Sequence, residues 1–196
     1  TECSPLITAN MSLQADKMAS CGREISCCHV KIDSPDENNE GEILVQGENV
    51  MLGYFRNQEA TDSALRDGWF HTGDIGRFDK DMYLYITGRI KNIIVLKNGK
   101  NIYPEEIEGY LYKIPYIKEV VVSGSGGSGG EEISIGCEIY PDLERAKTDN
   151  IEDVESVIKR EISRINSEIS YYKRVTTISF RDKEFDKTTS KKIKRK

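Results

Sequence analysis

The hydrophobic and polar positions of the chain change their period several times, and these changes divide it into predicted strands and helices. Across residues 133–139, isoleucine and cysteine alternate with serine, glycine and glutamate, which is typical of a half-buried strand. From Asn150 to about Ser167, apolar residues recur every three or four positions, so a helix is predicted with Asn150 as its N-cap. The apolar face of this helix comprises Val154, Ile158, Ile162, Ile165 and Ile169.

A second helix is predicted to begin at Pro104. Proline is tolerated in a first helical turn because its missing N–H would have no partner there, and the carboxylates of Glu105 and Glu106 favour the positive helix end. Its apolar face comprises Ile107, Tyr110, Leu111 and Ile114.

Short apolar runs bounded by turn-forming residues predict the strands. The polar run 34–40 reads as a hairpin loop, and Lys97-Asn98-Gly99-Lys100 as a second hairpin turn, because Asn-Gly favours positive backbone angles. Glycine and aspartate interrupt residues 69–79, where loops between short strands are expected, and a short helix is expected at 59–65. The expected strands are 24–32, 41–47, 83–86, 93–96, 101–103, 118–123, 133–139 and 175–180.

The order of these elements after Tyr103 is helix, strand, strand, helix, strand, which predicts a small α+β sandwich. Residues 124–130 consist only of glycine and serine and are interpreted as a flexible connector, either natural or an engineered replacement loop.

Composition narrows the class of protein. Of 196 residues, 37% are hydrophobic and 31% charged, and the net charge of -5 argues against a general nucleic-acid binder. No apolar run is long enough to cross a bilayer, no signal peptide is visible, and the start at Thr1 suggests a fragment or a processed product. The five cysteines fit a reducing, cytoplasmic location. A zinc site at Cys21, Cys27, Cys28 and His29 is disfavoured against buried thiols because the spacing matches no familiar ligand pattern.

Several segments in order resemble the signature motifs of the adenylate-forming superfamily, which includes the AMP-forming acyl-CoA synthetases. They are Thr1-Glu2, the run from Gly41 to Gly47 with Gly53-Tyr54, His71-Thr72-Gly73-Asp74, Gly88-Arg89-Ile90-Lys91 with Gly99 and Pro104 to Glu108, and the run from Lys187 to Arg195. The hairpin region 97–108 looks most like the long-chain fatty-acid branch. The resemblance implies a C-terminal portion with an α+β fold: a β-rich end of the large domain at 1–88, a hinge at 89–91, and at 92–196 a mobile C-terminal domain with a three-stranded sheet and helices.

The resemblance also implies roles for single residues. Lys192 would be catalytic, since adenylation brings a carboxylate to the α-phosphate of ATP and needs a cation aimed at the developing charge. Asp74 and Arg89 would bind the ribose, Thr1 a phosphate and Glu2 the Mg²⁺, whereas Lys91 would be the hinge and Gly99 would let the pantetheine arm of CoA pass. Two positions depart from the family pattern, because Lys191 stands where glycine is usual and Asp186 where proline is usual.

Each role has a plainer alternative. Lys192 could belong to a solvated basic tail, Asp74 could make only its own turn contact, and Gly99 could serve only the hairpin turn. The family's phosphate-binding loop and the acyl pocket have no counterpart in the sequence, so ATP, CoA and fatty acid are expected to act through a longer parent enzyme, and this chain alone is expected to be inactive. The competing functions are an enzyme that loads an acyl group onto a carrier protein and a non-catalytic binding module that uses the basic tail on an acidic partner.

Overall fold

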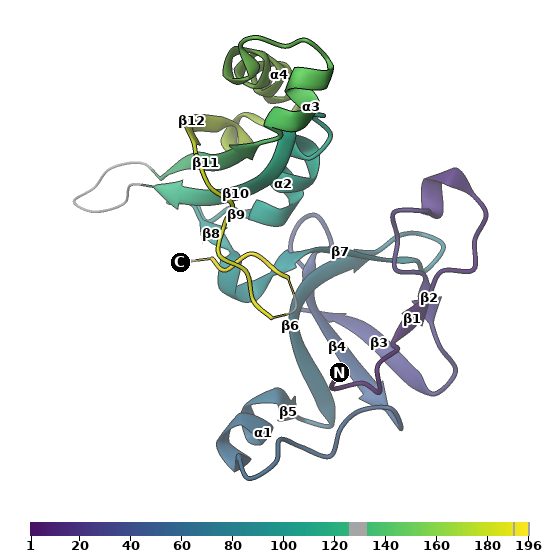
Figure 1. The fold of residues 1–196 in the computed structure, drawn as a ribbon. Helices are drawn as coiled ribbons and strands as arrows, with labels where there is room; N and C mark the ends of the chain where they lie inside the picture. Colours follow the sequence, from purple (N-terminus) through teal and green to yellow (C-terminus); the bar gives the residue numbers. More distant parts are fainter. Residues whose placement is uncertain (126–132, 190, 196) are drawn as a thin grey trace. The chain divides into compact units, whose positions relative to one another are not determined.

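The computed structural model describes residues 1–125, 133–189 and 191–195, and the chain divides into two compact units, Thr1–Lys91 and Asn92–Lys196 (Figure 1). The expected fold class is confirmed, since the first unit is rich in strands and the second packs a three-stranded sheet with helices. Of the glycine-serine connector, Gly124 and Ser125 end a strand, and the rest lies outside the described residues.

The first unit is built on one antiparallel sheet, in the order β3-β4-β6-β5, with β7 paired to β6. The predicted hairpin is confirmed, because β3 and β4 pair from Cys28 opposite Gly47 to Asp33 opposite Glu42. Its core gathers around the fully buried Val45. The elements are β1 (Thr8–Ala9), η1 (Ala15–Lys17), β2 (Arg23–Glu24), β3 (Cys28–Asp33), β4 (Gly41–Gly47), α1 (Gln58–Ala64), β5 (Leu65–Arg66), β6 (Trp69–Phe78) and β7 (Leu84–Arg89).

Two expectations for this unit are wrong. Residues 69–79 are not loops between short strands, because 69–78 form the single ten-residue strand β6, in which the register against β4 shifts between Glu42 and Leu44. A glycine in a strand often marks such a bulge, and Gly73 adopts φ +69° here. The expected strand 24–32 is broken into β2 and β3, with a turn at 25–27.

The break between β2 and β3 places the adjacent Cys27 and Cys28 in different environments. Cys28 is buried in β3 and its Sγ lies 3.3 Å from the carbonyl oxygen of Ile7, whereas Cys27 is exposed in the turn before the strand. Over 1–125, 133–189 and 191–195, the structure contains no group of three or more His, Cys, Asp or Glu side chains placed to hold a metal ion.

The second unit is centred on a sheet in the order β10-β11-β12, antiparallel between β10 and β11 and parallel between β11 and β12. The alternation in 133–139 is confirmed, because Ile135, Cys137 and Ile139 are buried. The short helix η2 (Ile90–Asn92) contains the boundary between the two units. The elements of the second unit are β8 (Ile94–Val95), β9 (Asn101–Ile102), α2 (Pro104–Leu111), β10 (Ile117–Ser125), β11 (Ser134–Pro141), α3 (Leu143–Thr148), α4 (Val154–Glu168), η4 (Tyr171–Lys173) and β12 (Val175–Phe180).

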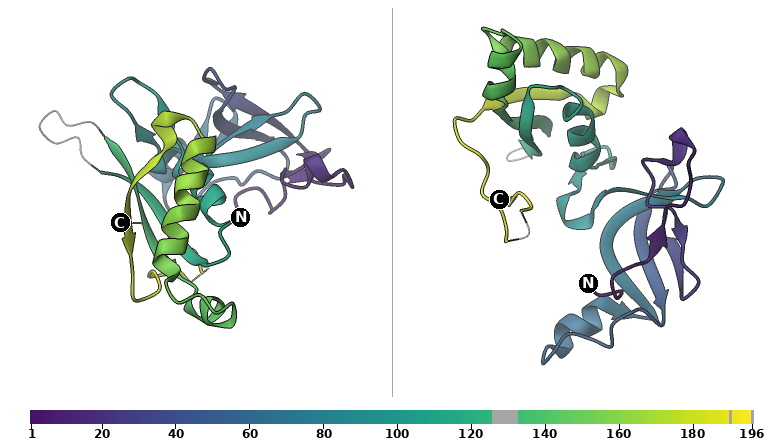
Figure 2. Two further views of the ribbon diagram at one scale, coloured as in Figure 1. Left: turned by 90° about the horizontal axis from the view of Figure 1, so that it is seen from above. Right: turned by 45° about the vertical axis from the view of Figure 1, so that its right-hand side comes forward.

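Helices α2 and α4 contribute to one core with this sheet, and Figure 2 shows α4 lying along it. Ile107 and Leu111 of α2 and Ile158 of α4 are fully buried, as the helical period predicts. None of the described helices is both long and apolar enough to cross a membrane.

The start of α4 differs from the prediction. Its N-cap is Asp153, whose side chain accepts a hydrogen bond from the amide of Ser156. Asn150 instead follows the unpredicted helix α3 and adopts φ +55°. The amides of Asn150 and Ile151 donate to the carbonyls of Lys147 and Ala146, respectively, so Asn150 ends one helix rather than starting the next.

Candidate functional site

Thr72, Gly73 and Asp74 form the bulged middle of β6. The Thr72 hydroxyl donates to the carbonyl of Ile43 at 2.7 Å and accepts from the amide of Asp74 at 3.0 Å. Asp74 lies directly opposite Arg89 in the β6–β7 register, and its Oδ1 is 2.9 Å from Arg89 Nε. The two predicted ribose-binding residues are therefore brought together as a partly exposed ion pair.

Glu42 supports this bulge from β4, a role that no sequence motif indicated. Its Oε1 accepts the amide of Gly73 at 3.0 Å, and its Oε2 is 2.8 Å from Nδ1 of His71. The same ring nitrogen is 2.8 Å from Arg66 Nη2, so the tautomer of His71 decides which of the two contacts is a hydrogen bond. The position of Glu42 directly after Gly41 in the motif was the one feature of the sequence that could have indicated its role. The sequence does not show its contact with Gly73, because the two residues are 31 positions apart.

Thr1 and Glu2 lie beside the segment that follows β4. The backbone carbonyl of Glu2 accepts the amide of Met51 at 2.7 Å, and its Oε1 accepts the hydroxyl of Tyr54 at 3.3 Å. Burial raises the pKa of Tyr54, and the neighbouring Glu2 carboxylate acts in the same direction. The side chain of Thr1 is exposed. Mg²⁺ often uses one or two protein carboxylates together with substrate phosphates and water, and the half-buried Glu2 carboxylate suits that mode.

Lys91 lies in the short helix η2, and its neighbour Asn92 begins the second unit. The side-chain amide of Asn92 donates to Glu105 Oε1 at 2.5 Å, which ties the start of the second unit to the first turn of α2. The other oxygen, Glu105 Oε2, is buried and has no hydrogen-bond partner among the described residues. The role of residues 89–91 as a hinge stays a prediction.

Gly99 lies in the hairpin that joins β8 to β9. Its amide donates to the carbonyl of Leu96 at 2.9 Å, and the Lys100 carbonyl accepts the amide of Leu96. Gly99 adopts φ +78°, and a Cβ built on it would meet nothing within 4 Å. The predicted turn is confirmed, and the open space at Gly99 means that backbone conformation, not local crowding, explains the glycine.

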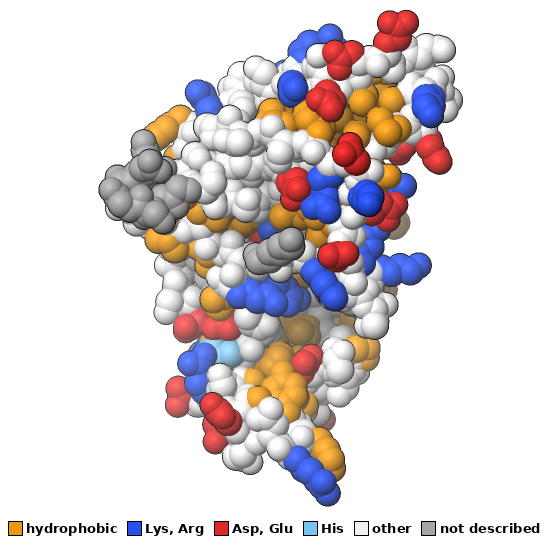
Figure 3. Space-filling model, turned by 60° about the vertical axis from the view of Figure 1, so that its left-hand side comes forward, with side chains coloured by type: hydrophobic (Ala, Val, Ile, Leu, Met, Phe, Trp, Pro, Cys, Tyr) orange, Lys and Arg blue, Asp and Glu red, His pale blue; other side chains and the backbone are white. Residues whose placement is uncertain are grey.

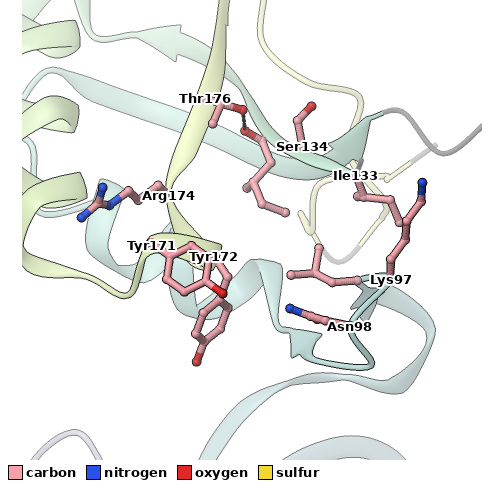
Figure 4. A pocket seen from close by; sticks show the side chains of 10 residues that line it. Lys97, Asn98, Ile133, Ser134, Tyr171, Tyr172, Arg174 and Thr176 are labelled. Carbon is pink, nitrogen blue, oxygen red and sulfur yellow. Dashed lines mark hydrogen bonds between the residues drawn. The ribbon is translucent and has the colours of Figure 1, made fainter. Parts of the chain in front are cut away.

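A pocket of about 460 Å³ lies beside this hairpin, wholly within the second unit. Figure 4 shows the rings of Tyr171 and Tyr172 on one side of it and Lys97 and Asn98 on the other. The two rings meet edge to face with centroids 5.6 Å apart. Lys100 Nζ lies 4.5 Å from the centre of the Tyr172 ring, a cation–π contact. Aromatic faces and lysine ammonium groups at one opening can receive a ligand with both a ring system and phosphates. The pocket was not predictable from the sequence, because its lining comes from three separate stretches of the chain, 96–98, 133–135 and 171–176.

The catalytic candidate Lys192 lies in a hairpin formed by the C-terminal residues. Lys187 and Ile193 are bridge partners, the amide of Thr188 donates to the carbonyl of Lys192 at 2.8 Å, and that of Lys194 to Asp186 at 2.8 Å. Lys191, which stands where the family has glycine, adopts φ +61°. The side chain of the next residue, Lys192, is exposed. The hairpin therefore places Lys192 directly after a position that requires the left-handed conformation.

Comparisons with known proteins agree on one family. Residues 91–196 match the family model described as AMP-binding enzyme C-terminal domain. The 2-succinylbenzoate–CoA ligase of Bacillus velezensis is 38% identical over 128 residues, which are 63% of this chain and 26% of that enzyme. The long-chain-fatty-acid–CoA ligase ACSBG2 of Gallus gallus is 44% identical over 96 residues, which are 48% of this chain and 13% of that protein.

A solved relative extends the match over most of the chain. The o-succinylbenzoate CoA synthetase (MenE) of Bacillus subtilis, in complex with its acyl-adenylate OSB-AMP, superimposes with a TM-score of 0.75 at 26% identity. The match covers 91% of this chain and 35% of the synthetase, which has also been solved with ATP and a magnesium ion. The chain thus spans between 13% and 35% of the length of these three relatives.

Proposed function

The chain belongs to the acyl-CoA ligase family of AMP-binding enzymes, and we propose that it forms the C-terminal portion of a ligase that activates a fatty acid with ATP and transfers it to CoA. In the first half-reaction, a carboxylate oxygen of the acid attacks the α-phosphorus of ATP, which forms acyl-AMP and releases pyrophosphate. In the second, the CoA thiol loses its proton and attacks the acyl carbonyl, and AMP leaves.

The observation that carries the proposal is the hairpin around Lys192. The positive φ of Lys191 is what a glycine in the family pattern would supply, so it supports the register in which the next residue, Lys192, is the catalytic lysine. An exposed ammonium on a short hairpin can approach an anionic site and stabilise the charge that develops between carboxylate and α-phosphate.

The first unit would supply the nucleotide contacts. Asp74 can accept the ribose hydroxyls through carboxylate oxygens while Arg89, its cross-strand partner, holds it in place and reaches the same sugar. Glu42 would keep the bulge in shape, since it binds the amide of Gly73. Glu2 would hold Mg²⁺ and Thr1 a phosphate. Bound Mg²⁺ would neutralise phosphate charge, and a solved relative contains both ATP and a magnesium ion.

The second unit would also receive CoA. The pantetheine arm would pass Gly99, where a side chain is absent and the surroundings are open. The adjacent pocket offers tyrosine rings for the adenine and the cation Lys97 for the phosphates. These features favour free CoA over a carrier protein, because a carrier presents the pantetheine arm without an adenine nucleotide. Titration of the chain with CoA should perturb the amide resonances around Gly99 and Tyr172. Lys97→Gln should weaken that binding, whereas Lys183→Gln, an exposed control, should not; equal affinities would count against the pocket.

The acid is proposed to be a fatty acid because the region 97–108 resembles the long-chain branch. The two ligase relatives are named for different acids, 2-succinylbenzoate and long-chain fatty acids, so the identity of the acid is a separate question from the adenylation chemistry. On its own the chain should release no pyrophosphate from ATP with any fatty acid. We also propose a cytoplasmic location from the cysteine pattern, all five cysteines being free.

The decisive experiment joins residues 91–196 of this chain to the N-terminal portion of the Bacillus subtilis synthetase and measures acid-dependent pyrophosphate exchange. Lys192→Ala should lower the exchange by roughly a hundredfold or more, the usual effect of losing one preorganised partner of the transition state. Lys194→Ala removes an exposed cation from the same hairpin and should have little effect. Equal rates for the two variants would refute the catalytic role.

A further inference from the structure

We propose that Arg195 and Lys187 are positioning residues for Lys192, and that they fasten its hairpin to strand β10. The inference deepens the proposed function and rests on it, because it matters for catalysis only if Lys192 is catalytic. Its structural half, the attachment of the hairpin, stands on contacts within the second unit. Both residues belong to the basic run that a sequence alone would treat as one solvated tail.

Arg195 fastens one arm of the hairpin by forming hydrogen bonds at the edge of the sheet. Its Nη2 is 2.6 Å from Oε2 of the buried Glu108, and its Nη1 donates to the carbonyl of Val122 at 3.2 Å. Oε1 of Glu108 accepts the amide of Val122 at 2.7 Å. The ion pair therefore satisfies both backbone groups of Val122. Because β10 is the edge strand of its sheet, the pair does what a neighbouring strand would do.

The chemistry of this contact favours arginine. The planar guanidinium can donate to the carboxylate and to the carbonyl at once, whereas a lysine ammonium is a single point of charge. Glu105 lies 3.4 Å from the same Nη2, so the guanidinium faces two carboxylates from the first turns of α2. Burial raises the pKa of Glu108, while the Val122 amide and Arg195 act in the opposite direction, so the carboxylate depends on these partners.

Lys187 fastens the other arm through Glu119 of β10. Glu119 is only 6% exposed, forms an ion pair with Lys187, and accepts the amide of Phe185 at 2.8 Å. Lys187 also contacts Glu184 at 2.8 Å. The hydrogen bond with Glu119 raises the pKa of Lys187, which favours the charged ammonium. The two attachments thus stand on either side of the turn that carries Lys192, whose own side chain remains exposed.

The charges of the tail are consequently divided between two tasks. Lys187 and Arg195 point at buried carboxylates, and Lys191, Lys192 and Lys194 remain exposed. On the face drawn in Figure 3, lysine and arginine side chains lie interspersed with aspartate and glutamate side chains rather than in one basic field. A hairpin held at both arms keeps the Lys192 ammonium in a restricted volume, which favours a preorganised catalytic group.

Hydrogen exchange on the chain itself tests the attachment. Arg195→Gln and Lys187→Met should each speed exchange of the Lys194 and Thr188 amides at least fivefold, and Lys194→Gln should leave the Thr188 amide unchanged. Glu108→Gln/Arg195→Gln avoids an unpaired buried carboxylate and should still exchange faster, because a glutamine at 195 is too short to reach Val122. Unchanged exchange in the single and double variants would overturn the attachment, whatever reaction the parent performs.

The two half-reactions of the joined enzyme test the positioning role. Arg195→Gln should lower pyrophosphate exchange at least tenfold and change thioester formation from preformed acyl-AMP less than twofold, because only adenylation uses Lys192. Arg195→Lys should recover part of the exchange. Equal losses in both half-reactions, or none, would overturn the positioning role. If Lys192→Ala itself leaves adenylation intact, the proposed function fails, and the hydrogen-exchange result still decides the attachment.

Discussion

Replacement of Lys191 by glycine should make the C-terminal hairpin more stable. Lys191 adopts φ +61°, a region in which the Cβ of an L-residue approaches the following carbonyl oxygen. Its side chain is exposed, and its amide donates to the carbonyl of Thr188 at 2.9 Å, a bond that glycine can keep. The substitution thus removes strain while leaving the backbone hydrogen bonds of the hairpin in place.

The expected gain is small but measurable. A left-handed conformation costs a non-glycine residue roughly 1–2 kcal/mol. Glycine has more conformational freedom in the open hairpin, and this reduces the stabilisation by roughly 0.5–1 kcal/mol. The difference lies between about 0 and 1.5 kcal/mol, and its midpoint of about 0.75 kcal/mol corresponds to a roughly threefold lower population of the open hairpin, since 1.4 kcal/mol is about a factor of ten.

Amide exchange of Thr188 and Lys194 measures the change, because both amides donate to carbonyls of the hairpin. Neither residue is adjacent to Lys191 in the sequence. Lys191→Ala is the matched control: it removes the same charge but keeps a Cβ, so exchange should not slow. If Ala and Gly slow exchange equally, charge and not backbone strain is responsible, and the argument from φ is refuted. Faster exchange in the glycine variant would refute it as well.

Three further predictions follow from burial and charge. Ile158→Ala should lower the free energy of unfolding of the second unit by about 2–5 kcal/mol in a denaturant titration, since Ile158 is fully buried; a loss well under 1 kcal/mol would contradict this. The hydrogen bond from Lys17 lowers the pKa of Asp79 from 3.8 to about 2, so the stabilisation is present above pH 3.8 and lost as the pH falls through 2. The stability difference between the native chain and Asp79→Asn should therefore shrink over that window, and a constant difference would count against it. Burial raises the pKa of Cys137 to about 12, so at pH 8 a thiol reagent followed by mass spectrometry should label the exposed Cys27 and spare Cys137 until the chain unfolds; similar labelling rates would show that the sheet opens readily.

The fold was predictable wherever burial imposed a strong period. The strands at 133–139 and 175–180 and the faces of α2 and α4 follow directly from alternation or helical spacing. Two of the failures, those at residues 69–79 and at Asn150, share another cause. At Gly73 and Asn150 the chain enters the left-handed region, which turns a suspected loop into a bulged strand and a suspected cap into a helix stop. A pattern of apolar residues does not show where the backbone φ angle becomes positive.

The candidate site could be proposed from the sequence only as single residues. Short motifs indicated Asp74, Arg89, Gly99 and Lys192, and the structure pairs the first two across neighbouring strands. Their supports were not predictable, since Glu42 acts on Gly73 from 31 positions away and Glu108 meets Arg195 across 87 positions. Carboxylates of this kind look like ordinary surface residues until the topology brings them beside a partner.

The basic C-terminal run shows why that distinction bears on function. A solvated binding tail needs its charges directed outward, and removing any one of them should weaken binding by a similar amount. Here Glu108 and Glu119 are buried carboxylates that would be costly to leave unpaired, so the cations at 187 and 195 are required by the fold before any partner is considered. Charge removal at 187 or 195 therefore changes the shape of the hairpin, whereas removal at 192 changes only what the hairpin presents. An experiment that neutralises the whole run at once mixes these effects, and single substitutions separate them.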